Sequence, residues 1–535
     1  MRSRRSSDSS ITIFRSSRDG RSNSLDGLQR KQHTFSEAGD NEYGEEGLSK
    51  KELHEDSRHV FSKRRKYCLV WVVSLAGLVS PLSLNICFPA IDAIAKDLHI
   101  SIQSAMWSIT IYLVFQAIAP SFWGPISDAR GRRIAYIGAL TTVMVTNFAL
   151  VFVNDFTSLL VLRALQAFDS SAIVALASGT IADITSRTER GGYVSISTGI
   201  RIFGQAFGPV IGGFITDAFG FHSIFRFLFF VSGIVLAVVV FFVPETVRSI
   251  AGNGSARLGD SHRPSIYYWT GQPYLSSQPL PLRPRKGLTW YTPFTPLSML
   301  FQKDVFCVML CGSIFFTTWS MMMACSSNLF MSYYGLSIRQ TGLAFIPSGL
   351  GAVTGSVLAG IWMDREMRLA SDSYRIAHNI PASHTEPIQE RDDFPLEIAR
   401  YGFTGPTIFL FTLCFGLVGF SLEISIYPTL VLQFIVSATQ AMLFNINSTF
   451  MIDLFPTAGA SALAAGNIAR CLVASVGVAM IQPLLNALGT RVLFILLGLT
   501  AAIGSSLIAV ELYCGPKWRR ARAAKEKLTE DVRLP

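Results

Sequence analysis

The most informative stretch of the chain reads Gly204-Gln205-Ala206-Phe207-Gly208-Pro209-Val210-Ile211-Gly212-Gly213. It lies in an apolar run over residues 193–215, which is long enough to cross a bilayer as a helix. Gly204, Gly208 and Gly212 recur at every fourth position and form a smooth ridge, where a neighbouring helix backbone can approach closely. Gly213 extends this ridge by one residue. Pro209 lacks an N–H and loosens the helix beside it. The stretch therefore predicts a transmembrane helix that packs tightly on another helix.

The composition is that of a polytopic membrane protein. Of 535 residues, 50% are hydrophobic and only 15% are charged, with a mean hydropathy of +0.38, whereas soluble domains carry about 25% charged residues. The net charge of +10 comes from basic residues beside apolar runs, which the positive-inside rule explains, so we expect no nucleic-acid partner. The eight cysteines lie in or beside apolar segments without a CxxC pair, so we expect no disulfide framework, metal site or other cofactor.

Twelve apolar segments are separated by turns and polar loops. The first six occupy about residues 68–91, 105–127, 134–153, 158–182, 192–216 and 224–243. The second six occupy about residues 304–332, 341–363, 404–421, 427–451, 459–483 and 490–513. We therefore expect an all-α polytopic membrane protein with twelve transmembrane helices in two pseudo-symmetric halves, 63–243 and 304–514. The repeat is supported by charged residues at nearly matching offsets in the two halves, Asp183 and Arg201 against Asp453 and Arg470.

Polar segments flank and interrupt these halves. Residues 1–62 are rich in Ser, Arg, Asp and Glu, which predicts a disordered cytoplasmic tail. We expect a cytoplasmic linker at 244–303, a cytoplasmic insert at 366–400 and a basic cytoplasmic tail at 515–535. The basic cluster at 63–66 precedes the first span and places both termini in the cytoplasm. Two tail segments match basic-directed phosphorylation sites, so a protein kinase is an expected partner: Arg4-Arg5-Ser6-Ser7 and Arg21-Ser22-Asn23-Ser24.

A charged turn joins the second and third spans and reads Gly124-Pro125-Ile126-Ser127-Asp128-Ala129-Arg130-Gly131-Arg132-Arg133. Its glycines, Gly124 and Gly131, permit a tight turn, and Asp128 can lie near a helix N-terminus, where a carboxylate is favoured. The side chains of Arg132 and Arg133 can hold the turn at the inner surface and pair with acids, as a gate requires. A partial copy, 360–365, follows the eighth span and contains Asp364, but it lacks the later Gly-Arg-Arg.

Charged and amide side chains also lie inside the apolar spans. A carboxylate such as Asp169 in mid-span costs about 2.5–3.5 kcal/mol even on the gentler insertion scale, so it is usually paired or functional. Asp169 and Arg201 fall at similar depth on adjacent helices, and we expect them to meet, either for proton coupling or as a purely structural ion pair. Arg470 has no acid on the preceding helix, so we expect it to face a hydrated cavity or to use polar partners such as Asn467, where it can contact an anionic group of the substrate. Further amides predict either a central cavity or helix–helix contacts: Asn85, Gln166, Asn328, Gln440, Asn445 and Asn447.

These motifs resemble those of one transporter family. Residues 204–213 resemble the fifth-helix antiporter signature of major facilitator drug:proton antiporters, and 124–133 resembles the superfamily signature G-x-L-a-D-x-x-G-R-R. Residues 162–166 are similar to the fourth-helix motif R-x-x-Q-G, with Ala167 in place of the glycine. Residues 182–184, 244–255 and 467–472 resemble the fungal twelve-span antiporters of the quinidine-resistance and dityrosine-exporter group. The resemblance covers about 68–513 and implies the major facilitator fold, a cytoplasmic latch at 124–133 and a role for Arg163 in proton coupling.

The resemblance implies secondary active export of small organic molecules in exchange for protons by alternating access. Arg163, Arg201 and Arg470 against Asp169 make the candidate cavity positive, which argues against a site for lipophilic cations alone and leaves amphipathic, zwitterionic and anionic aromatic substrates open. The sequence contains no Walker-type phosphate loop or nucleophile motif, so we expect neither ATP drive nor an enzyme. A proton-coupled importer or facilitator and a non-transporting membrane sensor remain alternatives. We expect a monomer in the plasma membrane.

Overall fold

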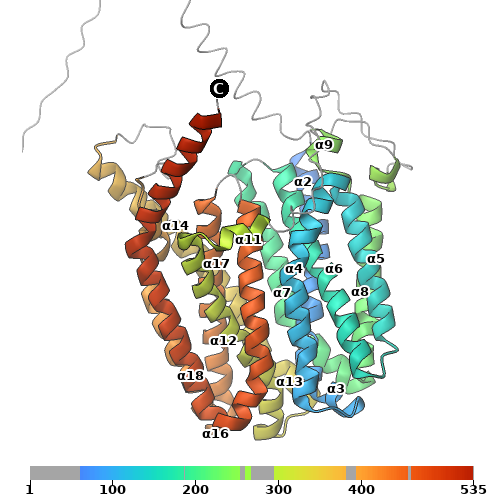
Figure 1. Ribbon diagram of the computed structural model, residues 1–535. Helices are drawn as coiled ribbons and strands as arrows, with labels where there is room; N and C mark the ends of the chain where they lie inside the picture. The colour runs from blue at the N-terminus through green and yellow to red at the C-terminus, as the bar shows by residue number, and fades with distance from the viewer. Residues whose placement is uncertain are drawn as a thin grey trace, which may run out of the picture. The chain divides into compact units, whose positions relative to one another are not determined.

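The structure is a computed structural model that describes residues 61–185, 187–252, 260–266, 295–380, 393–455 and 459–533. The N-terminal serines that match kinase sites, and nearly all of the segment expected to be disordered, lie outside these residues. Within the described part the chain forms helices and turns, and no strand. We call the end of the bundle where α2 begins and α18 finishes the upper end, as drawn in Figure 1, and the opposite one the lower end.

The first half is built from six long helices, α2 (Lys63–Asn85), α4 (Ile102–Arg130), α5 (Arg132–Leu150), α6 (Phe156–Ile184), α7 (Arg187–Phe219) and α8 (His222–Phe242). Two short helices, η1 (Phe88–Ala90) and α3 (Ile91–Asp97), follow α2 at the lower end (Figure 1). At the upper end, α8 is followed by α9 (Arg248–Ala251) and η2 (Asp260–His262).

The second half repeats this plan with α12 (Lys303–Tyr334), α14 (Ile346–Ala377), α16 (Thr404–Ile424), α17 (Ile426–Leu454) and α18 (Gly459–Arg533). Short helices connect them: α11 (Thr295–Leu300), α13 (Ile338–Ala344) and α15 (Leu396–Tyr401). The long α18 is two helices joined at Gly489, where the backbone leaves the helical region (φ 72°, ψ 169°). A positive φ of this kind is readily adopted only by glycine.

Eleven helices of the described part are long and apolar enough to cross a bilayer. With the two arms of α18 counted separately, they provide the twelve spans expected from the sequence. Two helices run beyond the expected spans, because α14 continues to Ala377 and α18 continues to Arg533. The charged residues that end these spans are mostly Arg, Lys and Glu, which are good helix formers, so they end the apolar segment without ending the helix.

Local signals in the sequence account for several helix starts. Asp155 caps α6 by accepting a hydrogen bond from the Ser158 N–H (2.7 Å), which also lowers the pKa of the Asp155 carboxyl. Ser337 and Gln340 form a reciprocal capping box at the start of α13. These caps fix where the lower-end turns stop and the next helices begin.

Helix packing is similar within the two halves, and a few helices join one half to the other. Within the first half α2 packs on α7, α4 on α6 and α5 on α8, and within the second half α12 packs on α18 and α14 on α17. The main contacts between the halves are α4 with α18 and α7 with α13 and α14. Helices from both halves therefore surround a shared central region.

The glycine ridge of α7 packs as the sequence predicts, on α2. An added Cβ on Gly204 or Gly208 would press on Leu78 or Asn85, and one on Gly212 would overlap the Ile86 carbonyl oxygen. Gly213 turns to the other half instead, where a Cβ would lie 2.8 Å from the Cα of Gly342 in α13. The same short segment therefore joins α7 to its own half and to the partner half near the lower end.

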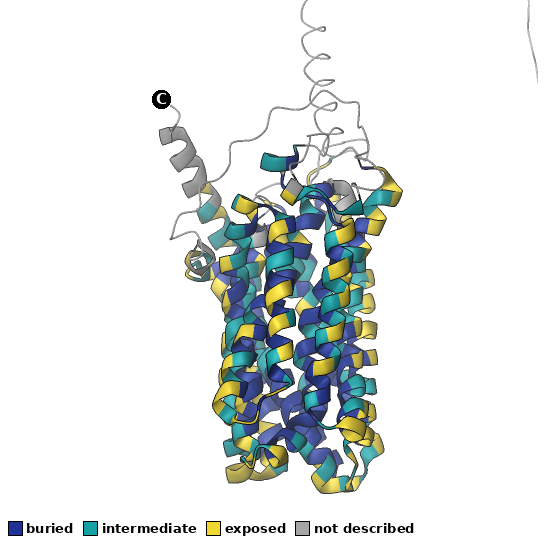
Figure 2. Ribbon diagram, turned by 90° about the vertical axis from the view of Figure 1, so that its right-hand side faces the viewer, coloured by how far each residue is buried: buried dark blue, intermediate teal, exposed yellow. Residues whose placement is uncertain are grey.

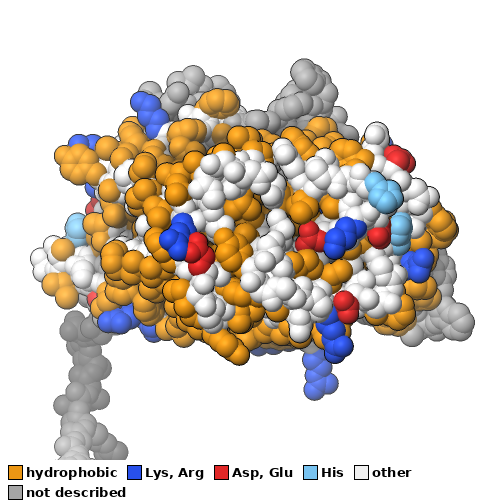
Figure 3. Space-filling model, turned by 90° about the horizontal axis from the view of Figure 1, so that it is seen from below, with side chains coloured by type: hydrophobic (Ala, Val, Ile, Leu, Met, Phe, Trp, Pro, Cys, Tyr) orange, Lys and Arg blue, Asp and Glu red, His pale blue; other side chains and the backbone are white. Residues whose placement is uncertain are grey.

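Burial agrees with a bundle that faces lipid. Buried residues concentrate between the helices, while exposed ones follow their outer faces and the two ends (Figure 2). Many of the exposed residues are large and apolar, including Phe230 and Val145 at 65% and 57% exposure. Seen from below, hydrophobic and uncharged side chains cover most of the lower end, with only scattered charged ones (Figure 3). Two contacts between the halves help to close this end, the stacked rings of Phe88 and Phe345 and the Arg339 guanidinium over Phe214.

Candidate functional site

A buried carboxylate closes the upper-end turn between α4 and α5. Glu245, which follows α8, accepts hydrogen bonds from the backbone N–H groups of Arg132 (2.8 Å) and Arg133 (3.3 Å) at the start of α5. It also contacts Nδ1 of His262 at 3.1 Å, and its side chain is fully buried. A helix N-terminus presents unpaired N–H groups and partial positive charge, which stabilise a carboxylate. Gly131 (φ 108°) is required here, because an added Cβ would overlap the Glu245 carboxylate.

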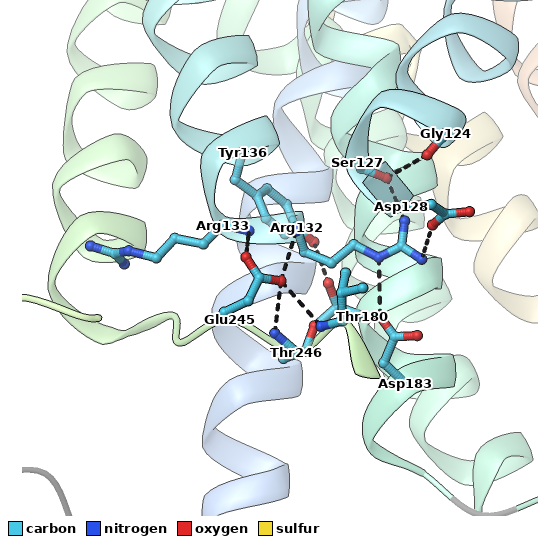
Figure 4. Close-up of polar contacts among 11 residues, drawn as sticks. Gly124, Ser127, Asp128, Arg132, Arg133, Tyr136, Thr180, Asp183, Glu245 and Thr246 are labelled. Carbon is cyan, nitrogen blue, oxygen red and sulfur yellow. Dashed lines mark hydrogen bonds and ion pairs between the residues drawn. The ribbon is translucent and has the colours of Figure 1, made fainter. Parts of the chain in front are cut away.

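Arg132 lies at the centre of an ionic network in this turn (Figure 4). Its guanidinium pairs with Asp128 (2.6 Å) in α4 and Asp183 (3.0 Å) at the end of α6, and it donates to the Ser127 hydroxyl at 2.5 Å. The Ser127 hydroxyl in turn donates to the Gly124 carbonyl (2.7 Å). These contacts tie three helices of the first half together at the upper end.

Arg133 has a different environment from its neighbour. Its buried guanidinium donates to the carbonyl oxygens of Val239 (3.2 Å), Val240 (2.9 Å) and Val243 (2.6 Å) at the end of α8. A cation is favoured at a helix C-terminus, where carbonyl groups lack partners within the helix. The two arginines of the motif therefore fasten α5 to different neighbours.

The second half does not build the same turn from its partial copy of the motif. Asp364 is exposed, and no ion pair of Asp364 exists within the described ranges. Asp453, at the end of α17, pairs instead with Arg400 of α15 (2.8 Å), as Asp183 pairs with Arg132 in the first half. Asp364, an expected gate residue, therefore makes no ionic contact. The arginine that pairs with Asp453 is Arg400, which lies between α14 and α16 and packs against the end of α17.

Two buried ion pairs attach the final arm of α18 to the second half. Arg519 donates to both oxygens of Glu397 in α15 (3.0 and 3.2 Å), and Arg522 pairs with Asp304 at the start of α12. The carboxylate side chains are 0% and 5% exposed, respectively. The segment expected to be a basic tail therefore begins as part of the folded bundle.

Arg163 of α6 lies in a polar cluster within the first half. The guanidinium donates to the Ser83 carbonyl (3.1 Å) and to Oε1 of Gln166 (2.5 Å), and it lies 4.5 Å from the centre of the Tyr112 ring. The Gln166 amide continues the chain of hydrogen bonds to Asn147 (2.6 Å). Arg163 and Gln166 are both buried, so they connect α2, α5 and α6 and do not line an open cavity.

Asp169 and Arg201 do not meet. Asp169 is 4% exposed and faces α4 near Trp123, and no ion pair of Asp169 exists among the described residues. Arg201 extends along α2 beside Gly77 and donates to Thr198 on its own helix (3.0 Å). Similar depth on adjacent helices was therefore not sufficient to predict a contact, because the Asp169 side chain points toward α4 and the Arg201 side chain toward α2.

Arg201 instead approaches Arg470 of α18, closely enough for the two cations to interact electrostatically. The Arg470 guanidinium lies over the rings of Phe316 and Phe444, 4.8 and 4.5 Å from their centres, and donates to Oδ1 of Asn467 (2.8 Å). Both arginines are half-buried, and neither forms an ion pair with any carboxylate in the described part of the chain. Two cations, one from each half and neither in an ion pair within the described part of the chain, thus lie within electrostatic range of each other.

Most of the remaining predicted amides make local contacts. Gln440 is buried with its carbonyl oxygen unbonded, and Asn445 bonds Ser356 of α14 (3.1 Å). Oδ1 of Asn447 accepts from the Tyr401 hydroxyl (2.7 Å), and Oδ1 of Asn328 accepts from the Ser332 hydroxyl on its own helix (3.3 Å). The Asn85 amide donates to the Pro81 carbonyl (2.6 Å) beneath the glycine ridge. Asn85, Asn328, Asn445 and Asn447 therefore serve contacts within and between helices of one half.

The sequence matches the family model described as Major Facilitator Superfamily over residues 73–374, more than half of the chain. The chain belongs to this superfamily. Among its relatives, Citrate exporter 1 of Aspergillus niger is 41% identical over 469 residues, covering 88% of this chain and 90% of the exporter. The MFS antiporter QDR2 of Candida albicans is 27% identical over 454 residues, covering 83% and 87%.

A solved member of the major facilitator superfamily shares the architecture. The structure of a D-xylose–proton symporter aligns with a TM-score of 0.59 at 14% identity, covering 83% of this chain and 97% of the symporter. This likeness confirms the all-α fold with two halves of six spans. Membership of the superfamily makes this chain an integral membrane transporter and not an enzyme.

Several site residues of this facilitator were not found from the sequence. Glu245 and Arg400 lie far along the chain from the residues they bind, and Phe316 and Phe444 look like ordinary apolar residues of their spans. A usable signal existed only for Glu245, which lies in the 244–255 stretch that resembles the fungal antiporters. Helix rotation, which places a side chain on one face or another, decides the rest.

Asp128→Asn should lower the maximal transport rate several-fold and change KM by less than about twofold. The partly exposed Asp128–Arg132 pair is worth about 1 kcal/mol or less, Asp183 still holds Arg132, and the central arginines are untouched. Initial rates over a range of substrate concentrations separate the two parameters. Asp364→Asn is the matched control and should change neither. A raised KM with an unchanged maximal rate would contradict a role in the upper-end turn.

Proposed function

We propose that this facilitator exports a multivalent organic anion, such as a di- or tricarboxylate, in exchange for protons. The observation that carries the proposal is the convergence of Arg201 and Arg470 without a neutralising carboxylate in the described part of the chain. Two like charges in a water-poor interior repel each other, and an anion between them removes this penalty. A substrate with two or more carboxylates can engage both guanidiniums, and so both halves, at once.

The similarity to a curated exporter supports the same substrate class. Citrate exporter 1 of Aspergillus niger is named for export of a tricarboxylate, and the match extends over most of both chains. Arginine is well suited to a carboxylate site because its planar fork binds two oxygens. The Phe316 and Phe444 rings fix the plane of Arg470 without using its donors, which leaves its remaining N–H groups for a ligand.

Proton coupling is assigned to Asp169. It is a buried acid in a transmembrane helix, on the same half as Arg201 but not paired with it. Intramembrane acids without an opposite charge to neutralise them are candidates for carrying protons. Because Asp169 does not contact either central arginine, proton and substrate would act at separate places and would be coupled through movement of the first half.

The orientation of the protein in the membrane is assigned from charge. Basic residues cluster at the upper end, including Lys63, Arg130 and Arg520, so we place this end and both termini in the cytoplasm. The contacts at Gly213, Phe88 and Arg339 close the lower end, which we assign to the outside. The plasma membrane is the proposed location, since it is where export leaves the cell.

The purified protein in proteoliposomes provides the test. Labelled citrate, malate and succinate should show counterflow, whereas a monocarboxylate and a lipophilic cation such as ethidium should not. An imposed proton gradient should drive accumulation that a protonophore abolishes. Counterflow of ethidium alone would overturn the anion assignment. Absence of all counterflow would favour a membrane sensor, and counterflow without gradient-driven accumulation would favour a facilitator.

Asp169→Asn should separate the two activities. The variant should keep counterflow, which needs no net proton movement, and lose accumulation driven by the proton gradient. Asp217→Asn, a carboxylate exposed at the end of α7, is the control and should keep both. Gradient-driven accumulation by Asp169→Asn at the wild-type level would show that another group carries the proton.

A further inference from the structure

Pro120 leaves one carbonyl group of α4 without its helical partner. In an α-helix the N–H of residue 120 would bond the carbonyl of residue 116, but proline has no N–H. The Gln116 carbonyl is therefore free in the middle of α4, between its start at Ile102 and its end at Arg130. An acceptor left in a membrane interior is costly unless another donor reaches it.

That donor comes from the other half of the protein. Nδ2 of Asn467 in α18 donates to the Gln116 carbonyl oxygen at 3.0 Å. The helices α4 and α18 belong to different halves and form one of the main contacts between them. A specific polar contact thus fixes the position of one half against the other at mid-membrane.

The same side chain holds Arg470. Oδ1 of Asn467 accepts from Nη2 of Arg470 (2.8 Å), one helical turn further along α18. The orientation of the amide is fixed on both sides, since a reversed amide would place two donors together at Arg470 and two acceptors together at Gln116. Asn467 therefore connects the proposed anion site directly to the contact between the halves.

We propose that Asn467 is a positioning residue that couples occupancy of the Arg470 site to the separation of α4 from α18. The proposal rests on the assignment of Arg470 to the anion site. When the halves move apart, the Gln116 carbonyl loses the Asn467 donor that replaces the missing proline N–H. This bond therefore favours the described state, in which α4 packs on α18. When an anion draws the Arg470 guanidinium away, Asn467 loses its second fixed contact and the bond between the halves weakens.

Pro120→Ala tests the bond without touching Asn467 or Arg470. Alanine restores an N–H that bonds Gln116 within α4 and competes with Asn467. Loss of one hydrogen bond corresponds to about a two- to tenfold change in an equilibrium constant. We expect a shift of that size away from the described state. Because coupling is reciprocal, the affinity for citrate should rise by no more than the same factor.

The conformational shift is measured by electron–electron resonance distances between spin labels at Trp107→Cys in α4 and Leu488→Cys in α18. Both positions are exposed and lie toward the lower end. The labels are placed in full-length protein in which the cysteines that are not buried have been replaced by serine (Cys68, Cys307 and Cys514). This readout needs no substrate, so it can fail or succeed independently of the anion assignment.

A double-mutant cycle distinguishes the shared bond from a change in helix shape. Asn467→Leu should shift the distance populations as Pro120→Ala does and should also weaken citrate binding. The double variant should be no more shifted than the larger single effect, because both changes remove one bond. Pro125→Ala is the matched control in the same helix. Pro125 also leaves a carbonyl, that of Ser121, without its helical partner, but no described side chain bonds this carbonyl. Restoring the N–H at residue 125 should therefore leave the populations unchanged. Additive shifts, or an unshifted Pro120→Ala, would overturn the proposal.

Discussion

Arg470→Ala should reduce transport of di- and tricarboxylates by about a hundredfold or more while leaving the protein folded in the membrane. Truncating one partner of a buried, hydrogen-bonded charge pair costs about 2–5 kcal/mol, and each 1.4 kcal/mol is about a factor of ten. The Phe316 and Phe444 rings lose a cation, not a packing partner on which the fold depends, so expression should persist. Counterflow rates and equilibrium binding of citrate measure the loss.

Companion variants show whether the charge or the guanidinium geometry matters. Arg470→Lys should recover only part of the activity, because an ammonium retains the charge but neither the planar fork nor the stacking over two rings. Arg491→Ala, which removes an exposed arginine paired with Glu423, is the control and should stay within about twofold of wild type. Equal transport by Arg470→Ala and wild type would exclude Arg470 from the anion site.

Arg201→Ala should be as damaging as Arg470→Ala, and removing Asp169 should not rescue it. Since Asp169 and Arg201 form no ion pair, the effects of Arg201→Ala and Asp169→Asn on citrate binding should be close to additive. Rescue in the double variant would mean that the two side chains do pair in another state of the transport cycle.

Gly212→Ala should sharply reduce the amount of stable protein. Its Cβ would overlap the carbonyl oxygen of Ile86, a backbone atom that can move only if α2 and α7 separate. Overpacking of this kind costs about 1–3 kcal/mol and sometimes more. Thermal stability in detergent, followed by the fraction of monodisperse protein after heating, should fall by several degrees or the protein should fail to accumulate.

Gly199→Ala is the matched control for this prediction. It lies on the same helix and makes the same chemical change, but no heavy atom lies within 4 Å of its added Cβ. Alanine is also the better helix former, so Gly199→Ala should be neutral or slightly stabilising. Equal stability of the two variants would contradict tight packing of α7 on α2.

Hydrophobic runs and basic clusters were sufficient to predict the spans, because the bilayer demands about 20 apolar residues for each crossing helix. The ends of α14 and α18 were not predictable from hydropathy, since Arg, Lys and Glu end an apolar run and still favour helix. The packing of Gly212 on Ile86 was predictable in kind, because a four-residue glycine spacing marks a close-contact face.

The central site was only partly predictable. Depth in the membrane follows from counting residues, and this places Arg201 and Arg470 at one level. Rotation about the helix axis does not follow from counting, which is why the expected Asp169–Arg201 contact is absent while Arg201 lies near Arg470. The Asn467–Gln116 bond depends on the absence of an N–H at Pro120 and on the partner half, so a search for charged motifs passes over it.

The two ion pairs of the last helical arm bear on how this protein is made. Arg522 is synthesised 218 residues after Asp304, and Arg519 follows Glu397 by 122 residues. Both carboxylates are buried. Glu397 therefore waits for its cation while the ribosome adds the final four spans, and Asp304, at the start of α12, waits while it adds the final six. The second half can reach its final packing only when the last turns of the chain have emerged. A protein truncated before Arg519 would keep every membrane span, yet it would leave two buried acids uncompensated and expose the upper end to quality-control proteolysis.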